Sequence, residues 1–221
     1  MSRVVGAVTI GQTPRHDVIP EIQAVLGAEI SIVQSGALDP FTLEEVRALA
    51  PGTTGHTLVT RMRDGTEVKL GKDFLVPRVQ ECIHELQNRA DLILLLCTGS
   101  FPRMESKRPV LYPEHVLYNT VRSIEPQRLG VLTPTSEQVA LQCERWHKIV
   151  NEVVVEVVSP YGELEELGSA TARLSRAGAD LVVMDCIGYT QVMKEIVREH
   201  TRKPVLLASS LLAHLAAEFL S

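Results

Sequence analysis

Two short apolar runs, each leading to a cysteine in a small polar loop, most constrain the fold of this chain. Residues 92–96 are directly followed by Cys97, and residues 181–184 end two positions before Cys186. Apolar runs of this length, bounded by Gly, Ser or Thr, are typical of the buried strands of a parallel sheet. A thiol at the carboxyl end of such a strand lies where α/β sheets bind their ligands. The sequence therefore predicts one ligand-facing thiol from each half of an α/β protein.

Strand-like and helix-like segments alternate along the chain. The strands expected from the pattern are residues 4–10, 29–34, 91–97, 128–133, 153–158, 180–186 and 204–207. The helices expected are residues 18–26, 43–49, 74–89, 137–151, 163–177, 191–200 and 209–219, and residues 109–123 are expected to be mostly loop followed by a short helix. Such alternation predicts a mainly parallel sheet with helices on both of its faces.

The stretch 57–70 differs from its surroundings. Residues 58–63 and 67–70 alternate between apolar and polar side chains, and Asp64 and Gly65 lie between them. Asp-Gly between two alternating runs is a strong signal for a β-hairpin. We expect an exposed antiparallel hairpin that is added to the main sheet.

The two halves of the chain resemble each other weakly. The segment VGAVTIGQT around Gly6 is similar to LGVLTPTS around Gly130, and each half later delivers a strand that leads to a cysteine. Ninety-one positions separate Gly6 from Cys97, whereas 56 separate Gly130 from Cys186. The excess of 35 positions roughly matches the segment that contains the hairpin. The sequence therefore predicts two pseudo-symmetric, doubly wound α/β lobes, with an insertion in the first.

The expected boundaries follow from this repeat. We place the first lobe with its hairpin at residues 1–125 and the second lobe at residues 126–207. Residues 208–221 are expected to form a closing helix that packs back on the first lobe.

The composition excludes several classes of protein. The chain is 45% hydrophobic and 22% charged, which is ordinary for a globular protein, and its net charge of −5 offers no basic surface for nucleic acid. No targeting leader and no membrane-spanning run is expected, and four cysteines without a CxxC pair are expected to be reduced thiols. We therefore expect a cytoplasmic protein with no nucleic-acid or membrane partner, and the option of a homo-oligomer stays open.

Four segments resemble a known family. They are TIGQTPR at residues 9–15, LCTG at 96–99, GVLTP at 130–134 and DCIGY at 185–189. With them the chain resembles the AroM family, within the aspartate/glutamate/hydantoin racemase superfamily. The resemblance implies two α/β lobes related by pseudo-symmetry, with one catalytic cysteine from each.

The flanks of both cysteines depart from the usual racemase pattern. Racemases of the superfamily usually follow the first cysteine with Asn-Thr, where this chain has Thr98 and Gly99. They usually surround the second cysteine as Gly-Cys-Thr, where this chain has Asp185 and Ile187. The resemblance therefore supports the fold more strongly than any particular substrate.

Two thiols that face one substrate from opposite sides suit racemisation. One thiolate removes a proton and the other thiol returns one to the opposite face, which requires that a thiol with an ordinary pKa near 8.5 be activated. We therefore expect a cofactor-independent racemase or isomerase, with Cys97 and Cys186 acting on a small carboxylate in a cleft between the lobes. The alternative is that the cysteines are small buried hydrophobes and that the protein binds a small carboxylate or other anion without catalysis.

Polar residues of the same loops are candidates for holding that carboxylate, because loop amides at helix starts favour anions. The candidates are Gly11, Gln12, Thr13, Arg15, Thr98, Gly99, Ser100, Pro134, Thr135, Ser136, Gly188, Tyr189 and Thr190. The other interpretation is that the Ser and Thr residues only cap helices, that Arg15 is solvated and that Tyr189 packs in the core. Asp185 is expected to cap a loop or to orient the site. No metal-ligand spacing and no nucleotide motif is present, so we expect neither a metal nor a cofactor.

Overall fold

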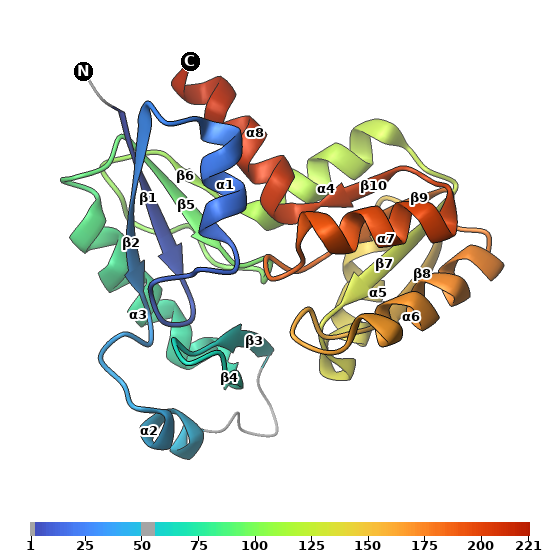
Figure 1. Ribbon diagram of the computed structural model, residues 1–221, viewed down its shortest axis with the longest axis horizontal. Coiled ribbons are helices and arrows are strands. Elements are labelled where there is room, and N and C mark those ends of the chain that lie inside the picture. The colour runs from blue at the N-terminus through green and yellow to red at the C-terminus, as the bar shows by residue number, and fades with distance from the viewer. Residues whose placement is uncertain (1–2, 50–55) are drawn as a thin grey trace. The chain divides into compact units, whose positions relative to one another are not determined.

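The computed structural model describes residues 3–49 and 56–221, and its contacts divide the chain into two units. One unit comprises Met1–Pro113 and Leu212–Ser221, and the other comprises Glu114–Leu211. Each contains a four-stranded parallel sheet that is flanked by helices (Figure 1). The predicted α/β fold with two related lobes is confirmed, whereas the lobe boundaries at residues 125 and 207 stay a prediction.

The first unit has the strand order β2-β1-β5-β6. Its elements are β1 (Arg3–Thr9), α1 (Ile19–Leu26), β2 (Ile30–Gly36), α2 (Leu43–Ala48), β3 (Thr57–Arg61), β4 (Glu67–Gly71), α3 (Lys72–Leu86), β5 (Leu92–Leu96) and β6 (Val110–Leu111).

The second unit has the equivalent order β8-β7-β9-β10. Its elements are α4 (Pro113–Ile124), β7 (Arg128–Thr133), the short 3-10 helix η1 (Ser136–Gln138), α5 (Val139–Trp146), β8 (Glu152–Val157), α6 (Leu164–Arg176), β9 (Leu181–Met184), α7 (Gln191–Thr201), β10 (Val205–Leu207) and α8 (Ala208–Leu220). The last nine residues of α8 group with the first unit, as does Pro113.

A glycine in the first strand of each unit lets a helix pack closely against the sheet. A Cβ on Gly6 would lie 3.2 Å from the Cβ of Ala90, and a Cβ on Gly130 would lie 3.0 Å from the Cβ of Ala179. Both glycines occupy the same place in their units, because each meets the end of the helix that precedes the cysteine-bearing strand. The weak repeat in the sequence thus reflects a shared packing requirement.

The strand register places the two cysteines at equivalent positions. Gly6 pairs with Ile93, and Gly130 pairs with Val182. Four residues beyond Ile93 is Cys97, and four residues beyond Val182 is Cys186. Counted from the paired glycines, both cysteines thus occupy the same position at the carboxyl end of their sheets.

Each cysteine-bearing strand also begins in the same way, with an aspartate that the sequence analysis did not single out. The Asp91 N–H donates to the Val4 carbonyl (2.8 Å), and its carboxylate accepts from the Val4 N–H (3.0 Å). In the second unit the Asp180 N–H donates to the Arg128 carbonyl (3.0 Å), and its carboxylate accepts from the Arg128 N–H (3.3 Å). Within each unit, the start of the cysteine-bearing strand is thus bonded to the start of the first strand at a matching point.

The hairpin β3–β4 is present, but it forms a sheet of its own. The expectation that it extends the main sheet was wrong, as was the expectation that it is exposed. Leu58 and Leu70 are buried in the same core cluster as Val8, Ile10 and Cys97. Burial of this apolar face stabilises the hairpin, because a two-stranded hairpin alone is marginal in water.

The segment 109–123 is more regular than predicted. It contains β6, which pairs with β5, and the 12-residue helix α4 that begins at Pro113. Proline is well suited to the first turn of a helix, where its missing N–H costs no hydrogen bond.

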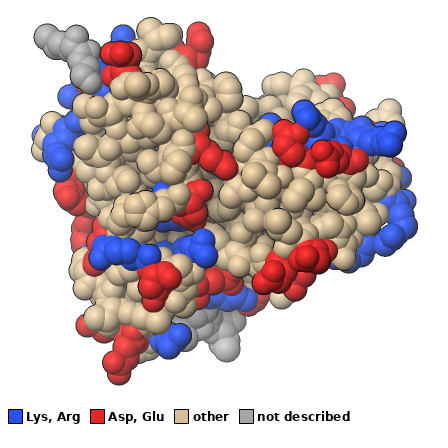
Figure 2. Space-filling view, viewed as in Figure 1, with Lys and Arg blue, Asp and Glu red and all other residues tan. Residues whose placement is uncertain are grey.

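Charges of both signs are interspersed over the molecular face drawn in Figure 2. This agrees with the modest net charge of −5. Among the described residues, no helix is long and apolar enough to cross a membrane.

Candidate functional site

Cys97 lies in the first loop position after β5, at the carboxyl edge of the first sheet. Its side chain is largely buried, with 8% exposed, and the backbone N–H of Gly99 donates to its sulfur at 3.4 Å. A hydrogen bond to sulfur stabilises the thiolate relative to the thiol. The loop thus places one backbone donor at the Cys97 sulfur.

The hairpin packs directly against this loop. A Cβ on Gly99 would lie 2.7 Å from a methyl carbon of Leu58, and a Cβ on Gly11 would lie 2.4 Å from the Arg61 carbonyl oxygen. The N–H of Gln12 donates to that same carbonyl (3.2 Å). Both glycines are required because β3 lies against the carboxyl ends of β1 and β5.

The side chain of Gln12 joins three loops. Its Nε2 donates to the carbonyls of Leu38 (3.1 Å) and Phe41 (2.8 Å), and its Oε1 accepts from the N–H of Arg63 (2.9 Å). The hydrogen bonds of this amide therefore connect the hairpin to the loop after β2.

Thr13 and Arg15 are also engaged by the protein. The Thr13 N–H and hydroxyl donate to the Asp39 carboxylate at 2.7 and 2.8 Å. Arg15 binds the Asp17 carboxylate with Nε and Nη2 (2.9 and 2.8 Å) and donates from Nη1 to the Thr9 hydroxyl (2.8 Å). Burial opposes ionisation of Asp17, but the hydrogen bonds and charge of Arg15 outweigh it and lower the pKa of Asp17. These contacts give Thr13 and Arg15 structural roles, and their substrate-binding roles stay predictions.

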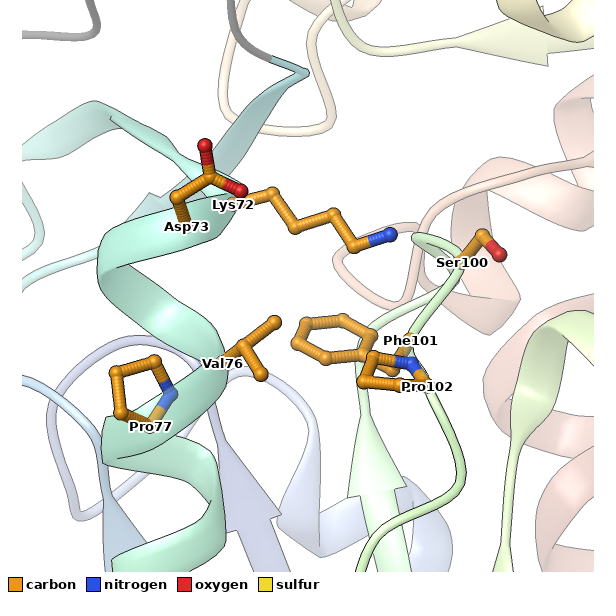
Figure 3. A pocket seen from close by; sticks show the side chains of 7 residues that line it. All are labelled: Lys72, Asp73, Val76, Pro77, Ser100, Phe101 and Pro102. Carbon is orange, nitrogen blue, oxygen red and sulfur yellow. The ribbon is translucent and has the colours of Figure 1, made fainter.

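The remaining residues of the Cys97 loop differ in exposure. Thr98 is buried, whereas Ser100 is exposed and borders a pocket of about 490 Å³ at the start of α3 (Figure 3). The sequence had indicated Ser100, but not the pocket.

Cys186 lies in the second unit, two positions beyond the end of β9, and its side chain is 9% exposed. It belongs to the same core cluster as Met184, whereas the intervening Asp185 forms an ion pair with Arg145 of α5. The Arg145 guanidinium also lies over the Trp146 ring, 4.5 Å from its centroid, and burial lowers the pKa of Arg145 to about 10. Asp185 thus anchors the cysteine loop to α5. Sequence spacing had not indicated Arg145 as its partner.

The residues after Cys186 are tightly packed. Tyr189 is buried, its hydroxyl donates to the Val158 carbonyl (2.6 Å), and burial raises the pKa of Tyr189 well above its ordinary value. A Cβ on Gly188 would lie 2.7 Å from the hydroxyl oxygen of Tyr161, a residue that the sequence analysis missed. Thr190 caps α7 by accepting from an N–H of its first turn. The geometry favours core and capping roles for Tyr189 and Thr190.

The loop after β7 holds a carboxylate of the protein itself. The hydroxyls of Thr135 and Ser136 both donate to the Glu137 carboxylate, the latter at 3.1 Å, and Pro134 before them is buried. Glu137 and Ser136 are exposed, whereas Thr135 is buried.

The predicted residues fall into two sets, one at the carboxyl end of each sheet. The first set is Gly11, Gln12, Thr13, Arg15, Cys97, Thr98, Gly99 and Ser100. The second set is Pro134, Thr135, Ser136, Cys186, Gly188, Tyr189 and Thr190. That the two sets face one cleft stays a prediction. Within residues 3–49 and 56–221, no group of three or more His, Cys, Asp or Glu side chains is placed to hold a metal ion.

Comparisons with known proteins agree with this architecture. The family model described as AroM protein matches residues 5–220. No curated protein sequence matches. Among solved structures, allantoin racemase from Klebsiella pneumoniae is similar with a TM-score of 0.68 and 15% identity over 99% of this chain and 87% of that one.

Two further structures have the same fold. The maleate isomerase Iso from Pseudomonas putida S16 gives a TM-score of 0.63 at 16% identity, covering 99% of this chain and 92% of its own. Picrophilus torridus aspartate racemase gives 0.60 at 13% identity, covering 98% and 94%. At these identities the likeness establishes the fold alone.

Proposed function

The chain belongs to the AroM family, and we propose that it is a cofactor-independent racemase or isomerase of a small carboxylate, with Cys97 and Cys186 as its acid–base pair. The observation that carries the proposal is the strand register. It gives both thiols the same position, four residues beyond the partner of an equivalent glycine, in two sheets of equivalent order. We propose that the two lobes present these thiols to opposite faces of one substrate.

The proposed reaction begins with proton abstraction. One thiolate takes the proton from the carbon next to the substrate carboxylate, and the electron pair of the broken C–H bond stays on the substrate. The opposite thiol then gives its proton to the other face of that carbon. At the end of the reaction the first cysteine is a thiol and the second is a thiolate, and no oxidant is needed. The N–H of Gly99 at the Cys97 sulfur supports the thiolate form on the first lobe.

Two loops are the proposed carboxylate-binding groups. The hydroxyls of Thr135 and Ser136 already accommodate one carboxylate, that of Glu137, which supports their affinity for such a group. On the other lobe, the loop of Thr98 and Gly99 is the corresponding proposed group. We further propose a cytoplasmic location, which the four cysteines support because none of them forms a disulfide bond.

Exchange of substrate hydrogen with solvent tests this function. Candidate amino and hydroxy acids are incubated in heavy water and analysed by mass spectrometry and chiral chromatography. We expect deuterium incorporation by the wild-type protein, and loss of racemisation in Cys97→Ser and in Cys186→Ser, because a hydroxyl forms its anion far less readily than a thiol. Each single variant retains exchange from at most one enantiomer, since one base remains. Cys143→Ser is the matched control and leaves exchange unchanged.

A second candidate function is non-catalytic binding of a small carboxylate. It is favoured by the residues that flank both cysteines, which differ from the usual racemase pattern. In particular, Asp185 forms an ion pair with Arg145. This alternative predicts that no acid exchanges and that both cysteine variants keep their ligand affinity. Unchanged exchange by the Cys97→Ser/Cys186→Ser protein would refute the assignment of these two residues.

A further inference from the structure

A pocket of about 490 Å³ lies in the first unit, between the start of α3 and the loop after Cys97 (Figure 3). Four of its seven lining residues are apolar. The Val76 side chain and the Phe101 ring point toward one another across it, and Pro102 lies beside the ring. This volume is in the range of pockets that hold small organic ligands.

One cation reaches over this pocket. The Lys72 side chain extends from the first turn of α3 toward Ser100, whereas the Asp73 carboxylate is directed elsewhere (Figure 3). Among the described residues, no carboxylate forms an ion pair with the Lys72 ammonium. The pocket therefore combines an apolar interior with a positive charge at its rim.

The electrostatics of α3 favour an anion at the same place. α3 has 15 residues, and its N-cap, Gly71, contributes no side-chain hydrogen bond. A lysine at a helix N-terminus faces the positive end of the helix dipole, which is unfavourable, and the first turn of α3 already carries one carboxylate, that of Asp73. An anion beside Lys72 would be attracted by both the ammonium and the helix end.

The hairpin insertion sets the position of this lysine. Gly71, the last residue of β4, pairs with Thr57 of β3, and the Lys72 N–H donates to the His56 carbonyl (2.9 Å). The side chain thus projects from the point where the insertion passes into α3. A change in hairpin register would move it away from the pocket.

We propose that this pocket binds an organic carboxylate with a compact apolar body, its carboxylate paired with Lys72 and its body packed between Val76 and Phe101. Ser100 provides a hydroxyl at the rim. Binding here needs no chemistry at either cysteine, and it shares only Ser100 with the set of residues predicted around Cys97.

Binding of benzoate to the whole chain tests the proposal, with titration calorimetry for affinity and NMR shift changes for location. We expect saturable binding with shift changes at Val76 and Phe101. Benzamide, which lacks the charge, and acetate, which lacks the apolar body, should each bind about tenfold more weakly or worse. Equal binding of benzamide and benzoate would overturn the role of charge.

Substitutions locate the charge. Lys72→Met keeps the apolar stem and should weaken benzoate binding at least about tenfold, while Lys72→Arg should retain most of it. Lys69→Met, on the exposed side of β4, is the matched control and should bind like the wild type. Wild-type affinity in Lys72→Met, or shift changes confined to other residues, would overturn the proposal.

One further variant separates this inference from the proposed function. The Cys97→Ser/Cys186→Ser protein should still bind benzoate with the wild-type affinity, although it should not exchange substrate hydrogen. Loss of benzoate binding in that variant, with its fold intact by circular dichroism, would contradict a site that is independent of the thiols. Failure of hydrogen exchange in the wild type would refute only the proposed reaction.

Discussion

The ion pair of Arg145 and Asp185 allows a quantitative prediction for the loop that carries Cys186. The Asp185 side chain is completely buried and that of Arg145 is 15% exposed. Arg145→Met leaves the buried carboxylate without its cation, which costs about 3–5 kcal/mol when a buried pair is broken on one side. For a chain of this size each kcal/mol lowers Tm by about 2–4 °C, so we expect a fall of about 6–20 °C.

The matched control is a pair in the same unit that remains in solvent. Arg198 and Glu195 pair on α7 with side chains 62% and 39% exposed. Arg198→Met should therefore cost less than about 1 kcal/mol. Calorimetric and urea unfolding of both variants measure the difference.

A double-mutant cycle identifies the cause. If the loss arises from an uncompensated charge, Arg145→Met and Asp185→Asn together should cost less than the sum of the single changes, by about 0.5–3 kcal/mol. A Tm for Arg145→Met that matches that of Arg198→Met, or strictly additive losses in the cycle, would refute the reasoning.

Two further predictions concern the loops of the candidate site. Gly99→Ala places a Cβ 2.7 Å from Leu58 and should lower the free energy of unfolding, measured in urea, by about 1–3 kcal/mol. The loss should be smaller when Leu58→Ala is already present. An equal loss in both backgrounds would contradict the packing of the hairpin on this loop. Burial raises the pKa of Tyr189 above its unfolded value near 10, so the folded state retains a proton that the unfolded state loses. The contribution of Tyr189 to stability is complete below about pH 10 and is lost as pH rises through the folded pKa. In Tyr189→Phe, the free energy of unfolding should therefore fall less steeply with pH in the alkaline range. The same slope in both proteins would contradict this prediction.

The sequence features that predicted correctly are local ones. An apolar run that ends at Cys97 or Cys186 can form only a few structures, and the polar loop that follows each run fixes where the strand ends. Asp64 and Gly65 likewise specify a tight turn between two strands, because Gly65 has a positive φ of 91°.

The features that escaped prediction depend on tertiary packing. Nothing local indicates that Leu58 of the hairpin lies on Gly99, or that Arg145 pairs with Asp185 across 40 positions of the chain. The contact of Tyr161 with Gly188 also joins two loops through the fold of the second sheet. A glycine two residues after each cysteine was the available signal, since it indicates close approach by some other segment.

The central claim is that Cys97 and Cys186 serve one carboxylate site. Iodoacetate tests it, because this reagent is itself a small carboxylate and a thiolate displaces its iodide to form a stable thioether. Of the four cysteines, Cys143 is partly exposed and the other three are buried. Reactivity that followed exposure alone would therefore label Cys143 first.

The most direct measurement is intact-mass and peptide analysis of chains labelled to about one-half by iodoacetate, with iodoacetamide as the uncharged comparison. The account predicts that iodoacetate labels Cys97 or Cys186 ahead of Cys143, that the preference weakens with iodoacetamide, and that chains carrying both labels are far rarer than independent reactions would give. Preferential labelling of Cys143, or doubly labelled chains at the frequency of two independent reactions, would contradict a single site shared by the two thiols.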